Sequence, residues 1–110
     1  MSRTIHALLI GIDEYPVPAH RLRGCLADCD AMRDYLRSLE GKDLSLRLRL
    51  LGNEEAGRGN VVEAFRHFEA AGDGDTCLLY FSGHGSRMPS PEAFWHIDLD
   101  RRCESLVCWD

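Results

Sequence analysis

The stretch that decides the fold is TCLLYFSGHG, residues 76–85, in which an apolar run ends at a histidine between two glycines. A nearly continuous apolar run predicts a strand buried on both faces of a parallel sheet, so we expect a strand over Thr76–Phe81. In open α/β sheets, ligands bind beyond the carboxyl ends of the strands. His84 follows the predicted strand closely and is therefore expected at such a site.

Other segments have the patterns of strands. The apolar run TIHALLIGI, residues 4–12, predicts a second strand that is buried on both faces. Leucine alternates with polar residues over 44–50, which predicts a strand with one face in water, near the edge of the sheet. After Gly85 we expect a proline-containing loop and then a short strand around Ser105–Trp109.

Two segments have helical spacing. An apolar stripe runs along Cys25–Leu39, and Gly41 follows as a stop signal. Asn60 and Glu63 resemble a capping box, which would open a second helix that runs to about Ala71. Its inward side chains are expected to be Val61, Val62, Phe65 and Phe68. The resulting order β-α-β-α-β predicts a right-handed, parallel, three-layer α/β sheet.

Composition excludes several classes of function. The chain has 110 residues, which suffice for one small domain. Its net charge of -5 argues against a nucleic-acid partner, and no apolar stretch is long enough for a membrane span. Its cysteines are odd in number and form no C-x-x-C pair, so we expect reduced thiols, no zinc site and a cytoplasmic location.

The glycines beside His84 suit chemistry at its imidazole. Gly83 and Gly85 remove side chains on either side, so a substrate backbone can approach closely. An imidazole titrates near neutral pH and can act as a general base, while the Gly85 N–H can stabilise an oxyanion. A histidine at a strand end can equally be a surface or hydrogen-bonded structural residue, and this alternative stays open on position alone.

Four blocks in order carry a family resemblance: ALLIGIDEY at 7–15, LRGCLADCDAMRDYL at 22–36, LLYFSGHGS at 78–86 and ESLVCWD at 104–110. Together they resemble the caspase-like cysteine peptidases, and among these the metacaspases and their bacterial relatives. The resemblance implies a three-layer caspase-like fold with a mainly parallel sheet. It also implies endopeptidase activity by a cysteine thiolate, with His84 as the catalytic base and the Gly85 N–H in the oxyanion hole.

The same resemblance implies a substrate pocket lined by Cys25, Asp28 and Ser82. A carboxylate in such a pocket favours an Arg or Lys side chain of a peptide substrate. Caspases that cleave after Asp have an arginine where this chain has Leu22. We therefore expect cleavage after basic residues. A solvated Asp28 in the first helical turn and a merely buried Cys25 thiol are the structural alternatives.

The nucleophile expected of this family is missing from the sequence. No D-x-C-x-S-G block follows His84, and Cys108 lies in a stretch that precedes the nucleophile strand in the family. Cys77 is expected in the core, and Cys103 lies in a charged loop. We therefore interpret residues 1–110 as the N-terminal, large-subunit-like part of one peptidase domain. This part is incomplete and inactive alone, and its partners are a peptide or protein substrate and a C-terminal segment or subunit that carries the nucleophile.

Other interpretations remain. Some metacaspases need calcium, and the acidic residues after His84 are Asp98, Asp100, Glu104 and Asp110. Calcium needs about six or more oxygen ligands, which no loop here supplies, so we expect no cofactor and a solvated acidic loop. A non-catalytic caspase-like module for regulation would also fit the missing nucleophile. A phosphate-binding flavodoxin-type domain would need a glycine-rich loop where Asp13 and Glu14 stand, and these carboxylates repel phosphate.

Overall fold

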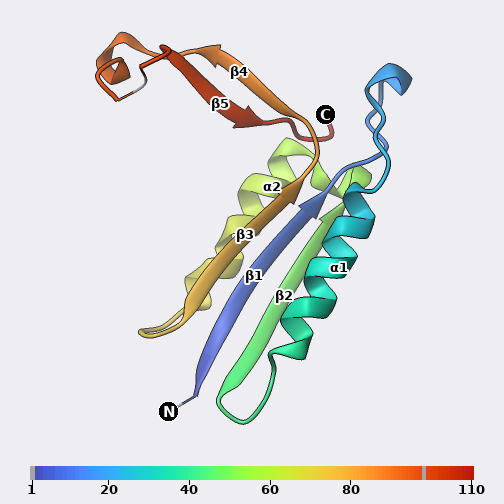
Figure 1. The fold of residues 1–110 in the computed structure, drawn as a ribbon, viewed down its shortest axis with the longest axis vertical. Coiled ribbons are helices and arrows are strands. Elements are labelled where there is room, and N and C mark those ends of the chain that lie inside the picture. Colours follow the sequence, from blue (N-terminus) through green and yellow to red (C-terminus); the bar gives the residue numbers. More distant parts are fainter. Residues whose placement is uncertain (1, 98) are drawn as a thin grey trace.

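Three parallel strands form the centre of the molecule in the computed structural model, which describes residues 2–97 and 99–110 (Figure 1). They are β1 (Arg3–Gly11), β2 (Leu44–Gly52) and β3 (Thr76–Ser82), in the order β2-β1-β3. Both neighbours of β1 run parallel to it. The strands predicted from the apolar runs and from the leucine alternation are confirmed.

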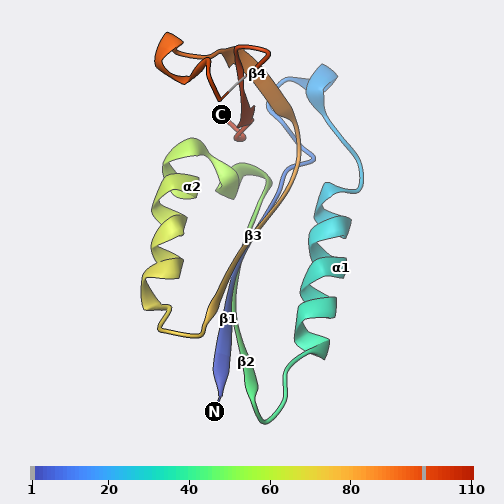
Figure 2. The same cartoon turned by 60° about the vertical axis from the view of Figure 1, so that its left-hand side comes forward.

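Helices cover the two faces of this sheet. Figure 2 shows α1 (Cys25–Ser38) on one side of the strands and α2 (Arg58–Ala64) on the other. The three-layer α/β fold is therefore confirmed. Short 3-10 turns complete the chain, at Pro18–His20, Asn53–Ala56, Phe65–Ala70 and Glu92–Phe94.

The core lies on both faces of β1. Leu8 and Ile10 are fully buried in a cluster with residues of α2, whereas Ala7 and Leu9 are fully buried against Cys29 of α1. Successive side chains of a strand point to opposite faces, so a strand between two helical layers is apolar at nearly every position. This explains the nearly continuous apolar run at 4–12, in which His6 is a buried polar exception.

The prediction for the second helix was wrong in several details. The α-helix begins at Arg58, and no side chain of its own N-cap residue accepts a hydrogen bond there. Instead, the carboxylate of Asp110 accepts the N–H of Arg58 at 2.7 Å, so the expected capping box of Asn60 and Glu63 is absent. The helix tightens to 3-10 geometry after Ala64. The expected inward residues divide: Val61 is buried and Phe68 partly buried, whereas Val62 and Phe65 are exposed.

The segment after Gly85 forms a hairpin, where a loop and one strand were expected. Strand β4 (Gly85–Pro89) pairs antiparallel with β5 (Arg102–Leu106), which ends before the predicted strand at 105–109 does. The hairpin projects beyond the carboxyl ends of the parallel strands (Figure 1). Its pairing joins residues far apart in sequence, so no local apolar pattern predicts it.

Strand β3 lies at the edge of the sheet. Among the described residues no strand pairs with its outer side, and Cys77 and Leu79 are exposed. The expectation of a β3 buried on both faces, with Cys77 in the core, is therefore wrong for the residues described. Within residues 2–97 and 99–110, every helix is too short or too polar to span a bilayer.

Candidate active site

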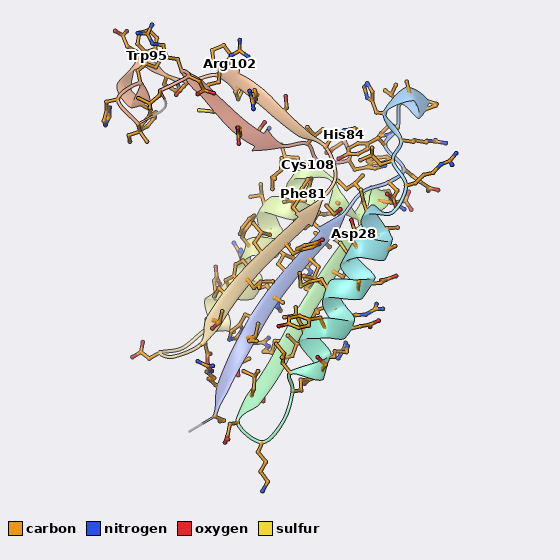
Figure 3. The ribbon with its side chains drawn as sticks, in the orientation of Figure 1. Asp28, Phe81, His84, Trp95, Arg102 and Cys108 are labelled. Atoms are coloured by element: carbon orange, nitrogen blue, oxygen red, sulfur yellow. The ribbon has the colours of Figure 1, made fainter. Side chains whose placement is uncertain are left out.

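Three segments meet at the carboxyl end of the sheet: the loop after β1, the start of α1 and the turn after β3 (Figure 3). Because the strands are parallel, their carboxyl ends lie together, and residues 54 to 92 positions apart come into contact. Both Asp28 and His84 lie at this end of the sheet in Figure 3. The site is therefore built by the topology of the sheet.

The carboxylate of Asp13 fixes the start of α1. Gly24 at the N-cap has a positive φ of 98° and no side chain to accept a hydrogen bond. The two oxygens of Asp13 accept the N–H groups of Cys25 at 2.8 Å and of Leu26 at 3.1 Å. A carboxylate there accepts two N–H groups that have no partner within the helix. Its negative charge also interacts favourably with the positive end of the helix dipole. This role of Asp13 was not predicted from the sequence, in which its signal is a helix start with glycine at the N-cap.

The three predicted pocket residues lie together. The hydroxyl of Ser82 donates a hydrogen bond to Asp28 Oδ2 at 3.1 Å. Burial raises the pKa of the Cys25 thiol, while its hydrogen bond with Ser82 acts in the opposite direction. Asp28 is exposed and Ser82 partly exposed, so the carboxylate can reach a ligand from solvent. The arrangement offers one negative charge beside a hydroxyl and a buried, protonated thiol.

The main chain holds the imidazole of His84. Its Nε2 lies 2.6 Å from the carbonyl oxygen of His20. A carbonyl oxygen only accepts hydrogen bonds, so this contact assigns the proton of the neutral ring to Nε2. The basic lone pair is then on Nδ1, and the half-buried ring keeps contact with solvent. This arrangement allows His84 to take up or deliver a proton at Nδ1.

Tyr15 joins His84 to the C-terminal segment, a role that the sequence analysis missed. Its hydroxyl accepts the N–H of His84 at 2.9 Å and donates to the carbonyl oxygen of Val107 at 2.8 Å. The ring centroids of Tyr15 and His84 are 4.9 Å apart. Tyr15 is only 3% exposed, and burial raises the pKa of its phenol, which keeps the hydroxyl protonated as a donor.

The tyrosine also explains the first glycine of the S-G-H-G motif. A Cβ at Gly83 would lie 2.8 Å from the Tyr15 hydroxyl oxygen and 2.9 Å from the Phe81 ring. Real Cβ atoms do not approach other atoms so closely, so any side chain here would displace the hydroxyl that holds His84. Gly85 is exposed and begins β4, opposite Leu106.

Three cysteines have raised thiol pKa values. Burial is the main cause in each case: it acts on Cys25, raises the pKa of Cys29 to about 11, and raises that of Cys108 together with the nearby Asp110 carboxylate. A nucleophilic cysteine needs a lowered pKa, because the thiolate is the reactive form. These three thiols therefore have the electrostatics of packing residues.

The acidic residues after His84 are engaged separately. Asp100 accepts the N–H of Arg102, Glu104 lies 3.6 Å from Arg87, and Asp110 binds the start of α2. Asp98 lies outside the described residues. Across the remainder of the chain, no group of three or more His, Cys, Asp or Glu side chains could hold a metal ion. The expectation that the chain holds no cofactor stays a prediction.

Comparisons with known proteins agree with this architecture. The family model described as "Caspase domain" matches residues 4–107. Metacaspase-8 of Arabidopsis thaliana is 36% identical over 89 residues, which cover 76% of this chain and 23% of the relative. Metacaspase-9 of the same plant is 32% identical over 92 residues, covering 76% of this chain and 28% of the relative. The chain therefore spans about a quarter of the length of these curated relatives.

Proposed function

The chain belongs to the caspase-domain family of cysteine peptidases, and from this premise we propose that it carries the base and part of the substrate pocket of an endopeptidase specific for Arg or Lys. The observation that carries the proposal is the meeting of His84, Asp28 and Ser82 at one end of the sheet. A module without chemistry has no physical need for this combination.

The proposed reaction uses His84 with a cysteine thiolate. The thiolate attacks the carbonyl carbon of the scissile bond, and the carbonyl oxygen takes up the negative charge. The N–H of Gly85 is the proposed donor to that oxyanion. Nδ1 of His84 carries the proton that it took from the thiol, and gives it to the leaving amine as the carbon–nitrogen bond breaks. A water molecule, which loses a proton to Nδ1, then attacks the remaining thioester and releases the carboxylic acid and the cysteine. The His20 carbonyl supports this role, because it holds the ring by Nε2 and leaves Nδ1 available.

The proposed specificity rests on Asp28. Its exposed carboxylate can accept charge-assisted hydrogen bonds from the guanidinium of Arg or the ammonium of Lys. The bond from Ser82 holds one carboxylate oxygen, which limits the orientations of the group without neutralising it. An Asp side chain in the substrate would meet like charge and be rejected.

We place the nucleophile outside residues 1–110, so that the chain alone is inactive. The raised thiol pKa values of Cys25, Cys29 and Cys108 support this placement. So does β3, whose outer edge has no partner strand among the described residues and whose Cys77 and Leu79 side chains are exposed. The proposed partners are thus a peptide or protein substrate and a segment or subunit that carries the cysteine. The odd number of cysteines and the negative net charge support a cytoplasmic protein without a nucleic-acid partner.

The test is covalent labelling of the full natural protein with a thiol-reactive peptide probe that ends in Arg. We expect mass spectrometry to locate the label on a cysteine outside residues 1–110, and His84→Ala to reduce labelling at least 100-fold. A label on Cys25 or Cys108 would contradict the placement of the nucleophile. A folded protein that takes no label, with or without added calcium, would favour the non-catalytic module instead.

A further inference from the structure

The projecting hairpin has an open edge along β4. Its sheet consists of β4 and β5 only, so β5 covers one side of β4 and no described strand covers the other. All five residues of β4, Gly85–Pro89, are exposed. An uncovered strand edge presents main-chain donors and acceptors to an extended peptide, and natural proteins usually blunt such edges.

The register shows which groups face outward. At the two ends of the ladder, Val107 N–H donates to the His84 oxygen at 2.9 Å and Ser90 N–H donates to the Arg101 oxygen at 2.8 Å. Hydrogen-bonded and non-hydrogen-bonded pairs alternate in an antiparallel ladder. These two bonds fall on His84 and Ser90, the even-numbered residues that flank β4. The odd-numbered residues Gly85 and Arg87 therefore direct their N–H and C=O groups away from β5.

Tyr15 fixes the beginning of this ladder. The pair of His84 with Val107 has one direct hydrogen bond, and the Tyr15 hydroxyl bridges the His84 N–H to the Val107 oxygen in place of the second. The outward edge therefore begins immediately after His84. The buried side chain of Tyr15 fixes which residues of β4 direct their main-chain groups outward. The edge ends at Pro89, an odd-numbered position whose N–H would point outward but which, as a proline, has no N–H to donate. The usable edge is short and starts at the proposed reaction centre.

We propose that the substrate residues that follow the scissile bond bind along β4 as an added strand. This inference rests on the proposed function, because it takes Gly85 as the residue nearest the oxyanion and His84 as the donor to the leaving amine. The leaving side of the peptide then begins beside His84, where the open edge also begins. Main-chain pairing of this kind gives affinity with little dependence on sequence.

A hollow on the hairpin adds room for one side chain. A cavity of about 440 Å³ lies at the base of the hairpin, lined by Gly85, Ser86, Arg87, Glu104, Ser105 and Leu106. Successive side chains of an added strand point to opposite faces, so every second substrate side chain would lie on the face with this hollow. Exposed Leu106 favours an apolar group there.

The test compares two substrates of the full natural protein within each variant. One substrate carries only a fluorogenic amine after the scissile bond, and the other continues for three residues. We expect the extended substrate to have about tenfold higher kcat/KM, the effect of one to two main-chain hydrogen bonds. Arg87→Pro removes the outward N–H and should reduce this ratio to about one. Arg87→Ala keeps the N–H and should retain the ratio.

A second measurement does not depend on how the variants fold. In the extended substrate, the amide of the second or the third residue after the scissile bond is N-methylated in turn. Because a strand alternates, methylation should remove the tenfold gain at one of the two positions and leave it at the other.

Three outcomes would overturn the proposal. They are a ratio that survives Arg87→Pro, a ratio lost in Arg87→Ala as well, and equal effects of methylation at both positions. Failure of the proposed function would look different, since the fluorogenic substrate would then be uncleaved or would be cleaved equally after His84→Ala.

Discussion

The two ends of the parallel sheet each hold a histidine, and they hold it in opposite ways. At the amino end, His6 is 2% exposed, and its Nε2 lies 3.0 Å from the Asp75 carboxylate. At the carboxyl end, His84 is half-buried, and its Nε2 faces the neutral carbonyl oxygen of His20. His6 lies within an apolar strand, whereas His84 follows one and stands between two glycines.

The two histidines differ in the surroundings of their second ring nitrogen, Nδ1. Nδ1 of His6 is buried and has no hydrogen-bond partner among the residues described, so the ring is closed to solvent and to substrates. In the proposed reaction Nδ1 of His84 carries the proton, while a backbone carbonyl orients the ring through Nε2 without carrying a charge. We therefore expect the carboxyl end of the sheet to determine activity and the amino end to determine stability.

Among variants that keep His84, the largest effect on activity is expected at Asp28. Replacement by Asn removes the pocket charge but keeps the size of the side chain. The loss of a charged hydrogen bond costs about 1.5–3 kcal/mol, so kcat/KM for an Arg substrate should fall by about 10- to 100-fold. The melting temperature should not change, since Asp28 is exposed. Enzyme kinetics and thermal melts of the full natural protein measure the two quantities.

The matched control for Asp28 is Asp30→Asn, on the same helix. Asp30 is exposed and lies 3.3 Å from Arg33, within the helix itself. The Asp30→Asn substitution should leave kcat/KM unchanged. A drop in melting temperature for Asp28→Asn, or equal kinetic losses in both variants, would mean that the carboxyl end contributes to stability more than the comparison allows.

A substitution at Tyr15 should affect both activity and stability, because this residue belongs to the core and to the site. Tyr15→Phe keeps the ring and removes the hydroxyl that bridges His84 and Val107. We expect kcat to fall about tenfold with KM nearly constant, and the free energy of unfolding to fall by about 1 kcal/mol. Tyr35→Phe, which removes an exposed hydroxyl on α1, is the control. An unchanged kcat in Tyr15→Phe would remove Tyr15 from the site and leave it a core residue.

Local patterns predicted the parts of the fold that depend on local physics. The buried strand at 4–12 and the helix from Cys25 follow from periodicity, and the alternating leucines of 44–50 do lie on an edge strand. The prediction for the helix at 58–64 failed at its start, because its cap is the carboxylate of Asp110, 52 residues away. A capping box is a local pattern and contains no information about such a partner.

Some residues of the site were likewise predicted from the sequence, and others were not. The resemblance supplied His84, Asp28 and Ser82, and sheet topology explains why they meet. The roles of Asp13 and Tyr15 could not be predicted from local patterns, because each side chain binds a distant segment. The Tyr15 hydroxyl, for example, donates to an oxygen 92 positions along the chain. The hairpin was missed for a related reason, since its pairing joins 85–89 to 102–106 across a segment without an apolar pattern.

The smallest effect is expected at the amino end, where Asp75→Asn should lower stability and leave activity intact. The Asp75 carboxylate accepts the N–H groups of Gly72 and Thr4 as well as the His6 contact, and these bonds lower its pKa to about 2. A carboxyl group with a lowered pKa stabilises the fold above its unfolded pKa of about 3.9 and loses this contribution as the pH falls toward 2.

The melting temperature of the natural protein should therefore exceed that of Asp75→Asn at pH 7, and the gap should close between about pH 4 and pH 2. Asp73→Asn changes an exposed carboxylate in the same turn and should show no such gap. Peptidase activity at pH 7 should be the same in all three proteins. A loss of activity in Asp75→Asn at a temperature where it is fully folded would mean that the amino end of the sheet communicates with His84, and the division between the two ends would fail.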